Sequence, residues 1–151
     1  MTAVVMDPRI DAAMPLTPET RAALVEALKL EAFEHVKYML FAAHARRGGN
    51  APLAERFERI AAVERDEHFA ELAALVGLVG SDVQNLVDAI SGASHDAFAV
   101  YREYADRAAA AGDLAAAVAL EKILGDEEDH RDEFTEALAV LERERNLDPE
   151  C

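Results

Sequence analysis

Acidic and histidine side chains that could bind metal ions recur at short spacings in three segments of the chain. The segments contain Glu31 with Glu34, Glu64 with Glu67 and His68, and Glu127 with His130. Residues three or four positions apart share one face of an α-helix, so each segment could present its side chains together. Carboxylates combined with imidazoles suit iron or manganese. The chemistry that these residues could support is therefore the binding of redox-active metal ions.

Four long helices are predicted to position these side chains. Ala, Leu, Glu and Arg are abundant, strand-type alternation is absent, and Gly and Pro occur at a few breaks, which is typical of an all-helical protein. Thr17 before Pro18 is a helix-start pattern, and the next break is at Gly48. The predicted helices span residues 17–47, 52–78, 81–111 and 114–145. The third is expected to bend near Ser91 and Gly92.

The two halves of the chain resemble each other. The segment "LVEAL" at 24–28 matches "LVDAI" at 86–90, and Glu64 corresponds in position to Glu127. Long helices with short links favour an antiparallel four-helix bundle, and the repeat predicts that it is a duplicated helical hairpin. We expect an all-α protein with an N-terminal extension over residues 1–16, the bundle over 17–146 and a short tail over 147–151.

The potential ligands fall within the apolar faces of the predicted helices. At about 100° per residue, Glu31, Glu64 and Glu127 lie in the middle of apolar stripes, and Asp96 lies on the equivalent stripe of the third helix, near Ala93. Burying carboxylates without partners is costly, so this arrangement is favourable only if cations compensate the charge. Two metal ions would do so, and Glu-x-x-His from facing helices is the dinuclear carboxylate arrangement of four-helix bundles.

These segments resemble a known family. The stretch "LEAFEHVKYMLFAAHARRGGN", then Glu64, then "GDEEDHRDEF" is similar to the ferritin-like superfamily and, within it, to the rubrerythrin-type diiron proteins. The resemblance covers residues 24–141. It implies that Glu31 is a ligand, that Tyr38 is the tyrosine near the metals, and that Glu127 and His130 form the Glu-x-x-His of the fourth helix. It also implies two bound iron ions, or a mixed iron–manganese pair, and electrons from a separate donor protein.

The sequence departs from the family pattern at three points. The family has a histidine where this chain has Glu67, and a glutamate where it has Ala93. Asp96 then remains the acid of the third helix, and Glu34 could replace the missing one. The chain has one cysteine, Cys151, so it carries no four-cysteine rubredoxin domain as a built-in electron donor.

Either Glu67 or His68 could complete the contribution of the second helix. In a regular α-helix His68 lies about 40° from Glu64 and could bind from there, or a one-residue π-bulge could bring it in. The correspondence between the two halves shifts by one residue at His68, as a bulge would require. Base rates favour the regular helix, so both residues are candidate ligands.

Charge and composition limit the classes of partner. The 30 acidic and 15 basic residues give a net charge of -15, which argues against nucleic acid or an anionic membrane as partner. No apolar run is long enough to span a membrane, and charges interrupt the apolar runs near the N-terminus. One cysteine excludes a disulfide framework. We expect a cytoplasmic protein.

Three functions are compatible with these residues. The first is reduction of hydrogen peroxide or activation of oxygen at a dinuclear centre, with Tyr38 or a protonated carboxylate delivering protons. The second is oxygen-dependent oxidation of a small organic substrate, in a pocket that the small side chain of Ala93 would open. The third is iron binding or helical assembly with a degenerate metal site.

A second apolar stripe on the first helix predicts a homodimer. Phe33, Val36, Leu40 and Ala43 lie on the side opposite Glu31. A helix that is apolar on two sides is buried on both or contacts a partner. We therefore expect two copies of the chain to associate through this helix.

Overall fold

The computed structural model describes residues 16–147, which form helices and short connections with no strand in that range. The all-α class is therefore confirmed. Most of the predicted N-terminal extension and of the C-terminal tail lies outside the described residues. Within residues 16–147, no helix has the length and apolarity that crossing a membrane requires. The chain divides into two compact units, residues 1–79 and 80–151, and each is described by itself.

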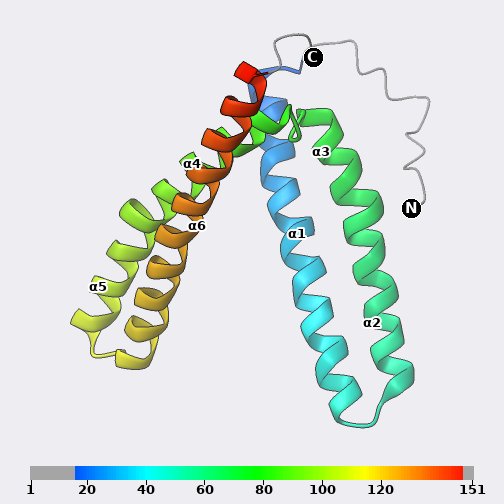
Figure 1. Cartoon of the computed structure of the whole chain (residues 1–151). Coiled ribbons are helices and arrows are strands. Elements are labelled where there is room, and N and C mark those ends of the chain that lie inside the picture. Colours follow the sequence, from blue (N-terminus) through cyan, green and yellow to red (C-terminus); the bar gives the residue numbers. More distant parts are fainter. Residues whose placement is uncertain (1–15, 148–151) are drawn as a thin grey trace. The chain divides into compact units, whose positions relative to one another are not determined.

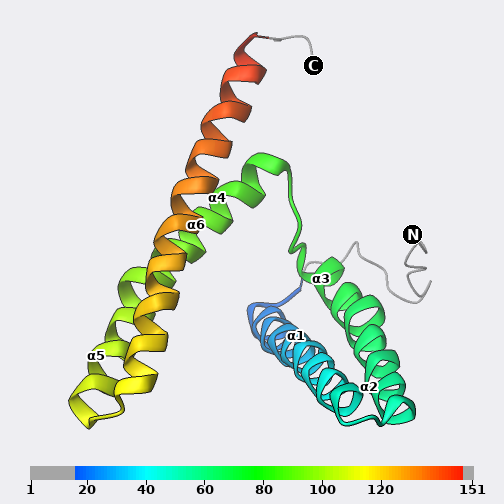
Figure 2. The ribbon, with the colours of Figure 1, turned by 60° about the horizontal axis from the view of Figure 1, so that its bottom comes forward.

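The first unit is a helical hairpin (Figures 1 and 2). Helix α1 (Pro18–Arg47) begins at Thr17, whose hydroxyl accepts a hydrogen bond from the Thr20 amide, as its sequence pattern predicts. A turn with Gly49 at φ 78° reverses the chain, and the Asn50 side chain caps the next helix. The returning helix consists of three consecutive segments: α2 (Ala51–Val63), η1 (Glu64–Phe69) and α3 (Ala70–Val76).

The second unit is also a helical hairpin. Its first helix consists of α4 (Asp82–His95), η2 (Asp96–Tyr101) and α5 (Arg102–Ala111). Ser81 and Gln84 form a reciprocal capping box at its start, and Gly112 adopts φ 85° in the turn that ends it. Helix α6 (Leu114–Leu147) returns along all three segments. The four predicted helices thus appear within one or two residues of their expected ends.

Alanines occupy the contact surface inside each hairpin. In the first hairpin they are Ala42, Ala45, Ala54 and Ala61, and in the second Ala93, Ala97, Ala105 and Ala117. Alanine has no side chain beyond Cβ, so the backbones of paired helices can approach closely at these positions. Apart from Leu28 and Val76, which are buried, larger apolar side chains remain partly exposed, as Phe57 does beside the Ala42–Ala45–Ala54 cluster. Each hairpin therefore has a thin core, and its other surfaces remain available for contacts.

The regular helix that base rates favour over residues 52–78 is not what the structure shows. The segment η1 is π-helical, and its wider turns accommodate one additional residue. The spacing of the residues that face α1 gives the reason. Ala54, Phe57 and Ala61 follow one another at three and four residues, and this alternation reaches Leu72 and Val76 only if one extra residue is inserted between Ala61 and Leu72. The π-helix restores the orientation of the buried residues that follow it.

A second π-helix, η2, was not predicted from the sequence. Ser91 and Gly92, where a bend was expected, both lie within the α-helical segment α4. Glycine lowers helix stability but does not require a change in helix geometry, so it is a weak indicator of a bend. The irregularity lies instead at residues 96–101, and it begins at the candidate ligand Asp96.

Candidate metal centre

Glu31, Glu64 and His68 converge in the first hairpin. Each offers one ligand atom, and these atoms all lie within 4.8 Å of one another. The Nδ1 atom of His68 lies 2.7 Å from Glu64 Oε2 and 3.4 Å from Glu31 Oε2. Among residues 16–147 this is the group of three or more potential ligands that the structure brings together. We call these residues the Glu31–Glu64–His68 cluster.

The cluster depends on the pairing of α1 with the returning helix. Glu31 comes from α1, whereas Glu64 and His68 come from the first and fifth positions of η1. His35, one turn after Glu31, has its Nδ1 atom 2.8 Å from the Ala61 carbonyl oxygen. A carbonyl only accepts, so Nδ1–H donates and ties α1 to α2 next to Glu64. A main-chain acceptor on another helix leaves no sequence signal, so the sequence alone does not reveal this role of His35.

The acidic surroundings of His68 favour its protonated form. The hydrogen bond with Glu64 raises the pKa of His68 above its usual value, partial burial opposes this, and Glu31 adds to the increase. Metal binding requires the neutral imidazole, so loading of the cluster must release this proton. We infer that metal affinity falls as the pH drops below the raised pKa of His68.

The raised pKa of His68 predicts a pH-dependent stability of the metal-free chain. Because the pKa of His68 is higher in the folded than in the unfolded chain, protonation of His68 stabilises the fold. This contribution is complete at pH values below the unfolded pKa, near 6.5, and is lost as the pH rises through the folded pKa. His68 is 52% exposed, so the effect should be below about 1 kcal/mol. The difference in unfolding free energy between wild type and His68→Gln should be larger at pH 6 than at pH 8. His95→Gln, at an exposed position of α4, is the control; an equal pH dependence in both variants would contradict the prediction.

Glu34 and Tyr38 lie outside the cluster. Lys37 Nζ donates to Glu34 Oε1 at 2.5 Å, and this bond, followed by the contact with Tyr38, lowers the pKa of Glu34. Glu34 in turn raises the pKa of Tyr38, with smaller contributions from Glu64 and Glu31. Glu34 Oε2 is buried without a hydrogen-bond partner. Glu34 is thus bound to a lysine, with one oxygen still available.

Glu67 and His68 are the two candidate ligands that follow Glu64, and they differ in their contacts. His68 joins the cluster, whereas Glu67 is exposed and is not part of it. The neighbouring Arg65 and Asp66 pair with each other at 2.6 Å and are also exposed. The π-helical turn therefore places the first and fifth residues of η1 toward α1 and leaves the intervening three in solvent.

In the second hairpin, two candidate ligands lie close together. Glu127 and His130 lie on α6 with Glu127 Oε2 and His130 Nδ1 3.6 Å apart. Asp96, the first residue of η2, is half-buried and does not form a group of three ligands with them. Ala93 is 6% exposed and lies where α4 packs against α6. The second hairpin therefore has two adjacent candidate ligands, Glu127 and His130.

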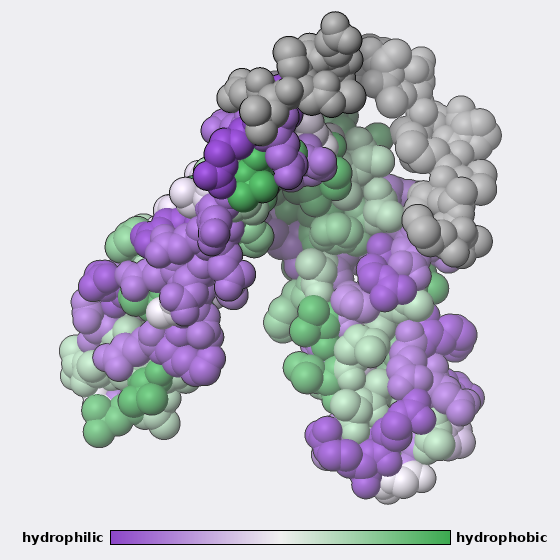
Figure 3. Space-filling model, in the orientation of Figure 1, coloured by the Kyte–Doolittle hydropathy of each residue, from purple (hydrophilic) through white to green (hydrophobic). Residues whose placement is uncertain are grey.

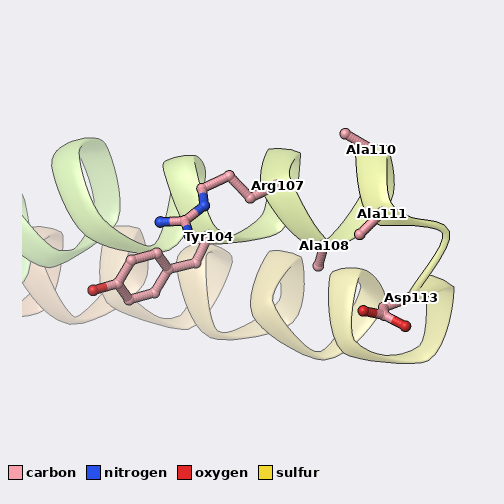
Figure 4. A pocket seen from close by; sticks show the side chains of 6 residues that line it. All are labelled: Tyr104, Arg107, Ala108, Ala110, Ala111 and Asp113. Atoms are coloured by element: carbon pink, nitrogen blue, oxygen red, sulfur yellow. The ribbon is translucent and has the colours of Figure 1, made fainter.

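Two pockets lie at the turns of the hairpins, away from the candidate ligands. One of about 360 Å³ near the α1–α2 turn includes His44, Asn50 and Phe57. The other, of about 560 Å³, lies at the α5–α6 turn (Figure 4), and its lining residues are Tyr104, Arg107, Ala108, Ala110, Ala111 and Asp113. Neither pocket includes Ala93, so they give no support to the predicted substrate pocket at that residue.

The donors of the Glu31–Glu64–His68 cluster fit a bound transition metal. Two carboxylates and one imidazole combine hard oxygen and intermediate nitrogen ligands, which suits iron or manganese. The spacing of the three ligand atoms, within 4.8 Å, allows them to contact one ion or two neighbouring ions with small side-chain adjustments. Without a cation, two carboxylates would lie side by side with only His68 to compensate them.

Comparisons with known proteins agree with this chemistry. The family model for rubrerythrin matches residues 22–138, which include all eight candidate metal ligands and most of both hairpins. None of the curated proteins matches the chain. The family is a ferritin-like diiron family, in agreement with the all-α fold and the convergence of Glu31, Glu64 and His68. Because the match covers most of its length, the chain belongs to the rubrerythrin family.

Proposed function

We propose that this protein is a non-haem dinuclear iron protein that reduces hydrogen peroxide with electrons from a separate donor protein. The observation that carries the proposal is the Glu31–Glu64–His68 cluster, in a chain that belongs to a diiron family. In this proposal Glu127 and His130 supply the ligands of the second hairpin. Asp96 and Glu34 are additional carboxylates. A mixed iron–manganese pair would fit the same donors.

The residues of the chain have distinct roles in this proposal. Glu31 and Glu64 supply negative charge, and neutral His68 supplies nitrogen. Two bound ferrous ions would supply the two electrons that cleavage of the O–O bond consumes, together with Lewis acidity. Reduction of one peroxide to two water molecules also takes up two protons. Tyr38 is protonated at neutral pH, as an ordinary tyrosine is, and Glu34 raises its pKa further, so its hydroxyl can donate a hydrogen bond beside the carboxylates.

The direct test is anaerobic loading with ferrous ions, followed by peroxide. We expect about two iron ions per chain, the number held by dinuclear carboxylate bundles. One equivalent of peroxide should oxidise both ions, with near-ultraviolet charge-transfer bands and full consumption of the peroxide. Reduction by a chemical donor should restore the starting spectrum. Failure to bind iron, or bound iron that leaves peroxide unconsumed, would refute the proposal.

The same experiment separates the other predicted functions. Oxygen uptake that depends on an organic substrate would identify an oxidase. Iron that binds without reacting with peroxide or oxygen would identify an iron-binding protein. The peroxide reaction is the stronger proposal, because the chain belongs to the rubrerythrin family.

A further inference from the structure

Two side chains of α1 donate hydrogen bonds to main-chain carbonyls of the returning helix. The Nη1 atom of Arg21 lies 2.8 Å from the Val76 carbonyl oxygen, and the Nδ1 atom of His35 lies 2.8 Å from the Ala61 carbonyl oxygen. Ala61 lies in α2, before η1 begins, and Val76 is the last residue of α3. The two bonds, which we call the Arg21 tie and the His35 tie, therefore bracket the π-helix.

The two ties enclose different lengths of chain on the two helices. On α1, 14 positions separate Arg21 from His35, whereas on the returning helix 15 positions separate Ala61 from Val76. Two paired α-helices rise equally per residue, so regular helices would be expected to use equal numbers between the ties. A π-helical turn takes up one additional residue. The ties therefore match the register that the returning helix has because of η1.

Apolar packing inside the first hairpin fixes this register only weakly. Its buried residues are mostly alanines, among them Ala42, Ala54 and Ala61, whereas Phe33 and Leu40 of α1 are each 66% exposed. On the face shown in Figure 3, apolar side chains lie along α1 and hydrophilic ones along the returning helix. Closely interlocking large side chains give a core one well-defined arrangement, and this interface has few of them. Hydrogen bonds between the two helices therefore gain importance for the register.

We propose that His35 is a positioning residue of the metal centre, because its bond to the Ala61 carbonyl holds the returning helix in the register that brings Glu64 and His68 to Glu31. His35 lies one helical turn after Glu31 on α1, and Ala61 lies about one turn before Glu64. The His35 tie thus joins the two helices within one turn of both carboxylates. This inference rests on the proposed function, since it concerns the same metal ligands.

The His35 tie is expected to increase metal affinity by fixing the ligands before the metal binds. Ligands that must first be ordered weaken binding by the cost of ordering them. Removing a group that orients a ligand without contacting the metal typically lowers affinity 10- to 100-fold. His35 acts through the main chain rather than on a ligand side chain. We therefore expect a loss near the lower limit of that range, about tenfold.

Matched substitutions separate the hydrogen bond from the bulk of the side chain. In His35→Asn the amide nitrogen takes the place of Nδ1 and can still donate to the Ala61 carbonyl. In His35→Leu the side chain has a size similar to that of asparagine but no donor. Leucine has the higher helix propensity, so propensity alone would favour His35→Leu, the reverse of the expected result. Arg46→Met is the control, because it removes a bond between α1 and α2, to Glu58, that lies outside the interval between the ties.

The first test is titration of the metal-free full chain with Co²⁺, which accepts carboxylate and imidazole ligands and whose visible absorption depends on coordination geometry. Wild type, His35→Asn and Arg46→Met should bind cobalt alike and give the same spectrum. His35→Leu should raise the dissociation constant about tenfold. Circular dichroism of each variant checks that it is folded. Wild-type affinity in His35→Leu would overturn the proposal, and so would an equal loss in His35→Asn, which would assign the effect to the imidazole ring.

The second test uses the metal-free chain and is therefore independent of iron binding and of the peroxide reaction. Nitrogen NMR of the neutral imidazoles should place the proton of His35 on Nδ1, because the Ala61 carbonyl accepts it. The exposed His95 provides the reference spectrum. Amide hydrogen exchange in η1, relative to α4, should be faster in His35→Leu than in wild type or His35→Asn. A proton on Nε2 of His35, or equal exchange in the three chains, would refute the positioning role even in a protein that reduces peroxide.

Discussion

Replacing Glu64 with alanine is expected to abolish tight iron binding and, with it, peroxide consumption. Glu64 Oε2 contacts His68 Nδ1 at 2.7 Å, and its side chain is 14% exposed, less than that of either other cluster member. Its removal leaves Glu31 and His68 without the group that orients His68. Loss of a residue that only supports a ligand typically costs 10- to 100-fold in metal affinity, so loss of a ligand should cost more than about a hundredfold. Iron per chain after desalting measures the effect.

Asp66→Ala is the matched control for this variant. Asp66 lies two residues further along η1, carries the same charge, and pairs with Arg65 in solvent rather than with the cluster. It should retain iron and react with peroxide like wild type. If both variants lost iron equally, the cause would be net charge or a disturbed π-helix. If Glu64→Ala retained its iron, the Glu31–Glu64–His68 cluster would not be the metal centre.

Deleting Asp66 is expected to leave the first hairpin folded, whereas deleting Ala32 should destabilise it strongly. Removing one residue from η1 allows the π-helix to become an α-helix with no change in the orientation of α3. Glu64 and the histidine are then three positions apart, the spacing of Glu127 and His130. The variant should keep its iron and melt within a few degrees of wild type.

Ala32 lies in regular α-helix, where no π-helical turn can accommodate the loss of one residue. Every later residue of α1 rotates by about 100°, so Ala42 and Ala45 leave the contact with the returning helix. We expect a loss of more than about 3 kcal/mol in the free energy of unfolding, comparable to removing a large core side chain. Urea unfolding of the metal-free proteins measures both deletions. If the two deletions destabilised the protein equally, the π-helix η1 would be required for folding, and its additional residue could not be removed without cost.

Much of the fold follows from local signals in the sequence. Thr17 with Pro18, Asn50 and Ser81 start helices because their side chains or rings suit helix N-termini, and these patterns are strictly local. The breaks around Gly49, Gly77 and Gly112 follow from left-handed backbone angles that glycine adopts without strain. Local patterns also place Glu31, Glu64 and Glu127 on the inner sides of their helices, which led to the metal-binding hypothesis.

The sequence by itself thus determined the helix boundaries, the two hairpins, the family and the types of candidate metal ligand. The tertiary structure decided how the ligands combine. His68 rather than Glu67 joins Glu64 because packing against α1 favours a π-helix that local propensity does not predict. Glu34 pairs with Lys37, and His35 bonds the Ala61 carbonyl, because side-chain partners depend on rotamers and on the neighbouring helix. Helical periodicity fixes the face on which a residue lies, whereas contacts between helices fix what it touches.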